Sequence, residues 1–252
     1  MILDDFKLTD QVAIVTGAGR GLGRALAVGL AEAGAHIAGV YRTGYEETRR
    51  QVEALGRRFY PIQADLAAEP TAPVVEQALK GLGRLDILVN NAGTIRRAPA
   101  LDYTERDWDE VMALNLKSGF FLSQAAARHW VAQGRGGKVI FIASVLAFQG
   151  GILIPPYTAS KHGAVGIVRL LSNEWASKGI HVNAIAPGYM VTDSTEALRE
   201  DPARSQAILG RIPAGRWGDP DDLKGAVVFL ASRASNYVHG ETLVVDGGWL
   251  GR

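Results

Sequence analysis

The sequence contains no cysteine. Disulfide bonds and thiolate metal sites are therefore excluded, because both are built from cysteine side chains. Histidine is also scarce, and its positions do not have the spacing of a metal site. The histidines are His36, His129, His162, His181 and His239. We expect no metal centre in this protein.

The chain has no large excess of positive or negative charge. It also has no long hydrophobic run. Its 27 basic and 26 acidic side chains leave a net charge of +1, which argues against a protein dedicated to nucleic acid or membrane surfaces. The most apolar stretch, KVIFIASVLAF, is too short to span a bilayer. The first residues, MILDDFKLTD, have neither the basic flank nor the apolar run of a signal peptide. We therefore expect a cytoplasmic protein.

Short apolar runs alternate with longer segments that have the periodicity of helices. Strands that are apolar throughout are buried on both faces, as in a parallel sheet, and strands joined by helices form βαβ units. The sequence predicts one α/β domain over residues 1–252, a doubly wound (Rossmann) sheet of seven parallel strands with helices on both faces. The expected strands lie within residues 12–17, 35–41, 58–66, 85–93, 137–144, 180–188 and 241–248. The expected helices are 21–34, 46–55, 74–82, 105–133, 157–178 and 222–232.

Residues 189–218 interrupt this alternation. They are polar, contain Pro202 and Pro213, and follow the end of the sixth predicted strand. Ligands of such sheets bind beyond the carboxyl ends of the strands. We predict that this segment is a small lid over the substrate, the alternative being a surface insertion.

A glycine-rich loop, TGAGRGLG, follows the first strand and opens the first helix. Gly17 permits a tight turn, Gly21 lets the backbone approach a pyrophosphate, and Gly23 lets helix and strand pack closely. The helix N-terminus offers amide N–H groups and a partial positive charge to phosphates. The strand–turn–helix context favours dinucleotide binding over a turn without a ligand.

The tip of the second strand indicates which dinucleotide binds. An acidic residue there suits the ribose of NAD, and an arginine suits the 2′-phosphate of NADP. The chain has Tyr41 and then Arg42, and Arg20 in the glycine loop adds a second guanidinium. These residues favour NADP(H). Glu46 and Glu47 lie close behind and leave NAD(H) possible, and the arginines could also be idle surface charges.

Further motifs occur in order along the whole chain: ADL, NNAG, ALNLKSG, a serine at 144, YTASK and APG. With the glycine loop, they make the chain resemble the short-chain dehydrogenase/reductase family. The resemblance implies an NAD(P)-dependent oxidoreductase and a homotetramer that pairs through the long helices after strands four and five. It assigns the catalytic roles to Asn115, Ser144, Tyr157 and Lys161. It assigns cofactor contacts to Gly17, Arg20, Gly21, Leu22, Gly23, Tyr41, Arg42, Asp65, Leu66, Asn91, Ala92, Gly93, Tyr157, Lys161, Pro187, Gly188, Met190 and Thr192.

The chemistry of these residues fits a carbonyl reduction. Tyr157 and Lys161 share one face of the predicted helix, and Ser144 ends the strand before it. A free phenol has a pKa of about 10. We expect the nearby ammonium and an oxidised nicotinamide to lower the pKa of Tyr157, which then acts as general acid in reduction and general base in oxidation. Ser144 would stabilise charge on the substrate oxygen. The alternative to a catalytic role is that Tyr157 and Lys161 lie on the exposed face of an amphipathic helix.

Several stretches resemble a narrower group within the family, the dehydrogenases of 2-deoxygluconate, 2-keto-3-deoxygluconate or gluconate. They are NNAGTIRR, SVLAFQGG, APGYMVTDST, RIPAGRWG and VDGGWL. The resemblance implies that a secondary alcohol and a ketone are interconverted on a sugar acid. Other substrates stay open: a 3-oxoacyl thioester, a uronate-derived keto acid or a steroid. A non-catalytic dinucleotide sensor is a further alternative.

A sugar acid needs a cation for its carboxylate and polar groups for its hydroxyls. We predict Arg97 for the carboxylate, with Arg96 as the other candidate, because both follow the fourth strand. We predict that Gln149 binds a hydroxyl and that Tyr189, which opens the lid, also contacts the substrate. The arginines could instead pair with acids on the rim. Trp249 is expected to pack against another subunit.

Overall fold

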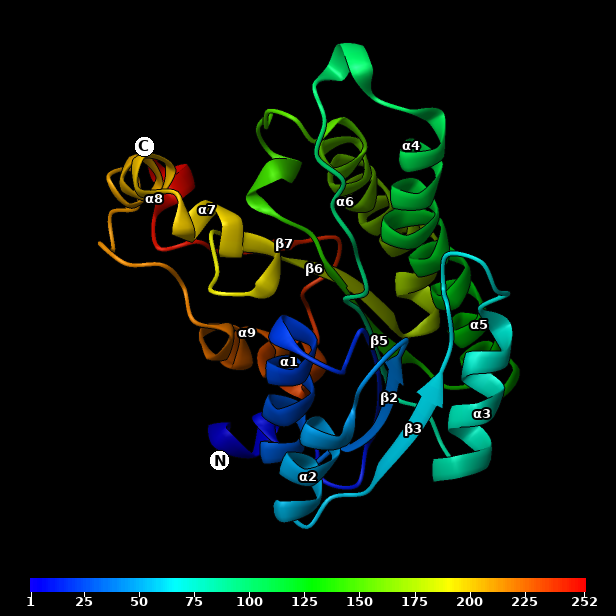
Figure 1. Cartoon of the computed structure of the whole chain (residues 1–252). Helices are drawn as coiled ribbons and strands as arrows, with labels where there is room; N and C mark the ends of the chain where they lie inside the picture. The colour runs from blue at the N-terminus through cyan, green and yellow to red at the C-terminus, as the bar shows by residue number, and fades with distance from the viewer.

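Seven parallel strands form the centre of the molecule in the computed structural model, which describes residues 1–252 (Figure 1). The sheet order is β3-β2-β1-β4-β5-β6-β7, so the first three strands extend the sheet to one side of β1 and the last four extend it to the other side. The predicted doubly wound, seven-stranded sheet is confirmed. Its strands are β1 (Val12–Thr16), β2 (His36–Tyr41), β3 (Phe59–Gln63), β4 (Ile87–Asn90), β5 (Gly137–Ile142), β6 (Ile180–Pro187) and β7 (Thr242–Val245).

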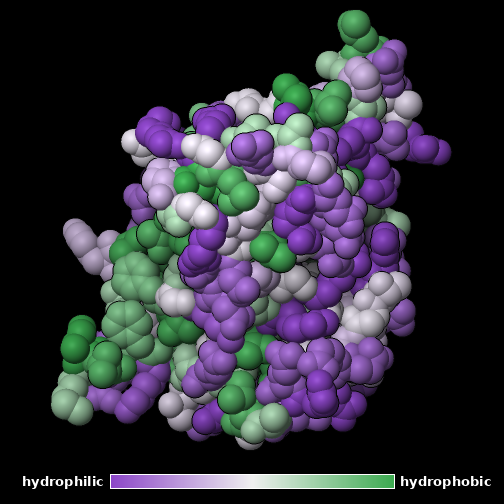
Figure 2. Space-filling model, turned by 60° about the vertical axis from the view of Figure 1, so that its left-hand side comes forward, coloured by the Kyte–Doolittle hydropathy of each residue, from purple (hydrophilic) through white to green (hydrophobic).

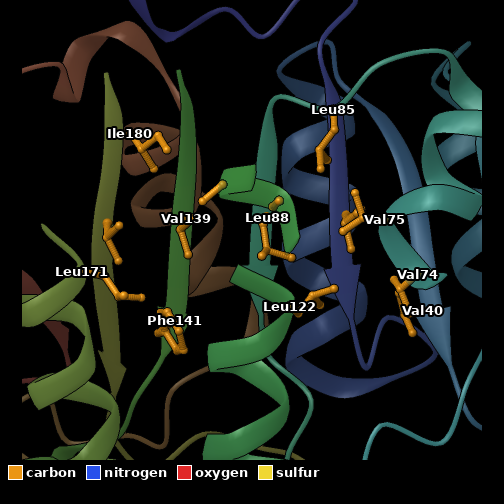
Figure 3. Close-up of a cluster of buried hydrophobic side chains, with 14 of the residues drawn as sticks. Val40, Val74, Val75, Leu85, Leu88, Leu122, Val139, Phe141, Leu171 and Ile180 are labelled. Atoms are coloured by element: carbon orange, nitrogen blue, oxygen red, sulfur yellow. The ribbon is translucent and has the colours of Figure 1, made fainter. Parts of the chain in front are cut away.

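Helices cover both faces of the sheet, and the two layers bury separate hydrophobic clusters. Figure 3 shows the first cluster, in which Val139 and Leu88 of the sheet meet Leu122 and Leu171 of the helices. Each such side chain contributes roughly 1.5–3 kcal/mol when it is fully buried. One face carries α3 (Ala72–Leu82), α5 (Ser118–Ala132) and α6 (Pro155–Trp175), and the other carries α1 (Gly21–Glu32), α2 (Glu46–Ala54) and α9 (Lys224–Ala231). None of the helices combines the length and apolar character needed to cross a membrane.

The long helical stretch predicted over 105–133 is confirmed, but its middle is a π-helical turn. Thr104 caps α4 (Glu105–Met112) by accepting a hydrogen bond from the backbone N–H of Asp107 at 3.2 Å. A π-helical turn, η3 (Ala113–Lys117), then separates α4 from α5. Such turns are frequent at functional sites, and Asn115 lies buried in this one. The sequence did not indicate this change of helix type within the predicted stretch.

Residues 189–218, which we call the lid segment, leave the sheet at the end of β6 and return to the same place. A parallel bridge joins Met190 to Gly218. Val191 donates a backbone hydrogen bond to the carbonyl oxygen of Gly218 at 2.8 Å, and Gly218 donates one to Tyr189 at 2.9 Å. The segment contains α7 (Glu196–Glu200) and α8 (Pro202–Leu209), which lie together beside the C-terminus (Figure 1). Figure 2 brings this side forward, and hydrophilic atoms cover most of it between smaller hydrophobic patches.

Short 3-10 turns complete the chain. They are η1 (Ile2–Phe6), η2 (Ala100–Asp102), η4 (Val145–Ala147), η5 (Ala176–Lys178), η6 (Asp193–Thr195), η7 (Pro220–Leu223), η8 (Arg233–Ser235) and η9 (Trp249–Gly251). The turn η9 brings the C-terminal residues back to the lid segment, where Trp249 packs with Ile208 and Ile212.

Candidate active site

Two cavities lie beyond the carboxyl ends of the strands. One, of about 900 Å³, is bounded by the ends of β4, β5 and β6 and by the lid segment. The other, of about 720 Å³, is bounded by the glycine loop and the ends of β2 and β3. Both are lined by Leu22, Asn91, Gly93, Thr94, Thr192 and Ser194, so they meet at the point where the sheet order reverses. Ligands of doubly wound sheets bind at this point.

Tyr157 and Lys161 enter the larger cavity from the first turns of α6. The ammonium of Lys161 lies 5.4 Å from the centre of the Tyr157 ring. The same ammonium donates a hydrogen bond of 2.7 Å to the backbone carbonyl of Ile142, at the end of β5. Burial lowers the pKa of Lys161 to about 8. Lys161 is therefore a cation that is held between β5 and the phenol but easily gives up its proton.

Ser144 follows β5 and faces the same cavity. Its hydroxyl accepts a hydrogen bond from the backbone N–H of Leu146 at 3.1 Å, which fixes its rotamer at the start of η4. Burial raises the pKa of Tyr157, while a hydrogen bond with Ser144 and the charge of Arg97 act in the opposite direction. Burial thus opposes the lowering of the Tyr157 pKa, which we predict for the site with an oxidised nicotinamide bound.

Asn115, in the π turn, is hydrogen-bonded to the segments on either side of the larger cavity. Its side-chain oxygen accepts a hydrogen bond from the Thr94 N–H at 2.8 Å, and its amide donates to the Thr94 carbonyl at 3.0 Å. The amide also donates to Ser160 at 3.2 Å, and the Ser160 hydroxyl donates to the Tyr157 carbonyl at 2.8 Å. Asn115 therefore ties the loop after β4 to the first turn of the helix that carries Tyr157.

The smaller cavity has the form of a dinucleotide cradle. Gly17 has a φ of +67°, which favours glycine. A Cβ on Gly23 would lie 2.0 Å from the carbonyl oxygen of Gly17, so no side chain can stand there. The loop thus exposes the free N–H groups that begin α1, the donors that bind phosphate. The residues present fit a dinucleotide.

The predicted cofactor residues line these two cavities. The smaller one is lined by Gly17, Arg20, Gly21, Leu22, Gly23, Tyr41, Arg42, Asp65, Leu66, Asn91, Ala92 and Gly93. The larger one is lined by Pro187, Gly188, Met190 and Thr192. Asn91 donates from its side chain to the Thr16 carbonyl at 2.8 Å, which joins the loop after β4 to the end of β1.

The end of β2 contributes a cation without an acidic partner. Arg42 has no carboxylate within salt-bridge distance, and no acidic residue follows the strand until Glu46. Arg20 instead pairs with Asp193 of the lid segment at 2.8 Å, and both side chains are exposed. A free guanidinium at this place suits the 2′-phosphate of NADP.

Only one of the two arginines predicted for the substrate reaches the larger cavity. Arg97 lines it and donates to the Ser194 carbonyl at 3.0 Å. Arg96 points away and pairs with Glu110 at 2.5 Å. Gln149 and Tyr189 line the cavity as predicted.

The lining residues that were not predicted from the sequence include Arg204, Arg211 and Trp249. The motif RIPAGRWG contains Arg211, but nothing local indicated where its side chain lies. The expectation that Trp249 packs against another subunit is wrong. It is 4% exposed and packs within its own chain, with its ring centre 4.6 Å from that of Tyr189. The guanidinium of Arg211 lies 3.9 Å from the centre of the Trp249 ring.

The chain is similar to known proteins over almost all of its length. A family model described as enoyl-(acyl carrier protein) reductase matches residues 17–250. The chain is 58% identical over 253 residues to 2-dehydro-3-deoxy-D-gluconate 5-dehydrogenase of Escherichia coli (strain K12), with 100% of each chain covered.

Solved structures are equally similar. A protein from Agrobacterium tumefaciens with bound NADP has a TM-score of 0.93 and 53% identity, over 99% of this chain and 100% of that one. A gluconate 5-dehydrogenase from Burkholderia cenocepacia J2315, in complex with NADP and tartrate, has a TM-score of 0.94 and 41% identity over 100% of both chains.

Proposed function

Since the chain belongs to the short-chain dehydrogenase/reductase family, we propose that it oxidises the C5 hydroxyl of 2-dehydro-3-deoxy-D-gluconate with NADP⁺, or reduces the 5-ketone with NADPH. It is an NAD(P)-dependent oxidoreductase of sugar acids, as its relatives are. The observation that carries the proposal is the cavity that joins Ser144, Tyr157 and Lys161 to the glycine loop. The charged residues lining that cavity are all cations, so it suits an anionic substrate.

Ser144 and Tyr157 are proposed to hold the reacting oxygen between them. In oxidation the phenolate of Tyr157 takes the proton of the C5 hydroxyl, and in reduction the phenol returns it. The ammonium of Lys161, 5.4 Å from the ring, stabilises the phenolate. Ser144 donates to the oxygen as charge develops on it. The nicotinamide, when bound, accepts the hydride from C5 or supplies it.

Cofactor contacts are proposed for the glycine loop, for Arg42 and Arg20 at the 2′-phosphate, and for Asp65 and Leu66 beside the adenine. NADP bound to two of the similar structures supports this preference over NAD. Lys161 is also proposed to hold the nicotinamide ribose. Asn115 is proposed as a positioning residue, because its side chain ties Thr94 to the first turn of α6.

Residues 189–218 are proposed to act as a substrate lid within the single domain. Their ends are joined by the bridge between Met190 and Gly218, while the middle of the segment lines the larger cavity. This arrangement allows the segment to cover the substrate without disturbing the sheet.

A homotetramer in the cytoplasm is proposed as the working form. Apolar side chains remain exposed on the helices that follow β4 and β5, and their burial against another subunit would stabilise an assembly. They are Trp108, Phe121, Val131 and Leu170, which are 41%, 45%, 49% and 50% exposed. Light scattering coupled to gel filtration tests this point, with an expected mass four times the 26.9 kDa of the chain.

The decisive experiment compares substrates and cofactors in one assay. Reduction of NADP⁺ and NAD⁺ is followed with 2-dehydro-3-deoxy-D-gluconate and with gluconate, and a 3-oxoacyl thioester is offered with NADPH. We expect the first acid to have the highest kcat/KM and NADP⁺ to be the better cofactor. Turnover of the thioester alone would show that the substrate class is wrong.

A further inference from the structure

The charged side chains around the larger cavity are Arg97, Lys161, Arg204 and Arg211, and they occupy different parts of it. Arg97 follows β4 and donates a hydrogen bond to the backbone carbonyl of Ser194 at 3.0 Å, and its charge lowers the pKa of Tyr157. Arg211 lies over the ring of Trp249, which packs on Tyr189, and the charges of Arg204 and Arg211 oppose the rise that burial causes in the pKa of Tyr189. The cavity therefore has one arginine from the loop after β4 and two from the lid segment.

Arg204 and Arg211, the two arginines of the lid segment that line the cavity, have no acidic partner. No carboxylate lies within 4.0 Å of Arg204 or Arg211, and neither guanidinium donates a hydrogen bond within the chain. Arg216, in the same segment, behaves differently, because its guanidinium pairs with both oxygens of Asp222, at 2.6 and 3.0 Å. A free guanidinium at the wall of a cavity without acids can bind a carboxylate from the ligand.

Arg211 is also held in place. Its guanidinium lies 3.9 Å from the centre of the Trp249 ring, a cation–π distance. Trp249 is buried and packs on Tyr189, and Tyr189 packs edge-on against Trp217 at 5.7 Å. The stack fixes the plane of the guanidinium before any ligand arrives, and this reduces the entropy lost on binding.

The length of the substrate separates its carboxylate from the carbon that reacts. In a six-carbon acid that reacts at C5, the carboxylate is four carbon–carbon bonds away, roughly 5 Å when extended. A cation that lies beside the phenol is then close to the reacting oxygen, and the carboxylate falls further along the cavity. The lid segment covers that part of the cavity.

We propose that Arg211, stacked on Trp249, is a specificity-determining residue that binds the substrate carboxylate, with Arg204 as a second cation. This inference rests on the proposed reaction at C5 of a sugar acid. It assigns the carboxylate to the lid segment and leaves Arg97 for oxygens near the reacting carbon. Substrate charge then draws the lid segment onto the substrate, which links recognition of the acid to closure of the cavity.

The test measures kcat and KM of Arg211→Ala, Arg204→Ala and the double variant, with the sugar acid and with a neutral polyol that has the same C5 centre. Arg216→Ala is the matched control, since it lies in the same segment but pairs with Asp222. We expect KM for the acid to rise about tenfold in Arg211→Ala and further in the double variant, with kcat nearly unchanged. KM for the polyol should not change in either.

An equal rise in KM for the acid and the polyol would overturn the inference. A selective rise in Arg97→Ala with no change in Arg211→Ala would overturn it too, and would return the carboxylate to Arg97. If the wild type turns over no sugar acid, the proposed function fails, but the cation site can still be tested. Tartrate titrated into the NADP⁺-loaded protein should then bind the wild type at least about tenfold more tightly than Arg211→Ala, and equal affinities would overturn the inference.

Discussion

The ammonium of Lys161 lies 5.4 Å from the centre of the Tyr157 ring while it donates a hydrogen bond to the end of β5. One cation thus serves the phenol and fastens α6 to the sheet. The arrangement is costly for the folded protein, because Lys161 is 5% exposed and has no carboxylate partner. Removal of the phenol and removal of the cation should consequently have different effects.

Tyr157→Phe should abolish turnover and spare the fold. The ring remains, and only the hydroxyl that exchanges the proton is lost. We expect kcat to fall at least about a hundredfold, the lower end of what general acid–base groups contribute. NADPH binding, followed by the change in cofactor fluorescence, should be unchanged. A variant that kept most of its kcat would remove Tyr157 from the proton-transfer step.

Lys161→Met should alter the pH dependence of stability. The pKa of Lys161 is about 8 in the folded chain and about 10.4 in an unfolded one. Between these values the unfolded chain binds more protons, so the free energy of unfolding rises with pH. The wild type should gain about 2 kcal/mol from this group between about pH 7.5 and 9.5.

Urea unfolding at the two pH values measures this gain. Lys161→Met should lose it and should also lose activity. Lys138, whose pKa burial also lowers to about 8, is a control in the same molecule, because its contribution persists in the variant. An identical gain in wild type and variant would show that Lys161 is not the group responsible.

Asn115→Ala should weaken both the fold and the catalytic rate. The substitution leaves the Thr94 N–H and carbonyl without their partner, which costs about 1–3 kcal/mol. We expect a lower melting temperature and a lower kcat with KM for NADPH little changed. Ser160→Ala removes the hydroxyl that joins the Asn115 amide to the Tyr157 carbonyl but leaves both bonds to Thr94, so it should show the smaller loss of stability. A loss of stability without any loss of kcat would make Asn115 purely structural.

Arg42→Ala should change the choice of cofactor. If its guanidinium binds the 2′-phosphate, KM for NADPH should rise about tenfold while KM for NADH stays constant. Arg20→Ala should have a smaller effect, since Arg20 is paired with Asp193 in the free protein. Arg50→Ala on α2, where Arg50 pairs with Glu47, is the control. Equal rises for both cofactors would assign the 2′-phosphate to other residues.

The juxtaposition of the residues proposed for catalysis could be predicted because it depends on local rules. Tyr157 and Lys161 are four residues apart on one helix, and Ser144 closely follows a parallel strand, so topology brings them to the same end of the sheet. The glycine loop was predictable for the same reason. The π turn was not, because it depends on the contact of Asn115 with Thr94 in another loop.

The stack of Arg211 on Trp249 also could not be predicted. It joins the lid segment to the last residues of the chain, and no periodicity or spacing relates the two. The choice between Arg96 and Arg97 failed to follow from the sequence because it depends on Glu110, which α4 brings beside Arg96. In both cases, the position of the arginine side chain depends on a contact with a distant segment of the chain.

The bridge between Met190 and Gly218 has a consequence for how this enzyme can diversify. Because the two ends of the segment are hydrogen-bonded to each other, residues 191–217 form a cassette with a fixed base. We expect that mutation or exchange of the cassette would change which molecules enter the cavity, while Ser144 after β5 and Tyr157 and Lys161 on α6 keep their positions. Part of the substrate selectivity could then change during evolution without a change in the residues proposed for proton transfer.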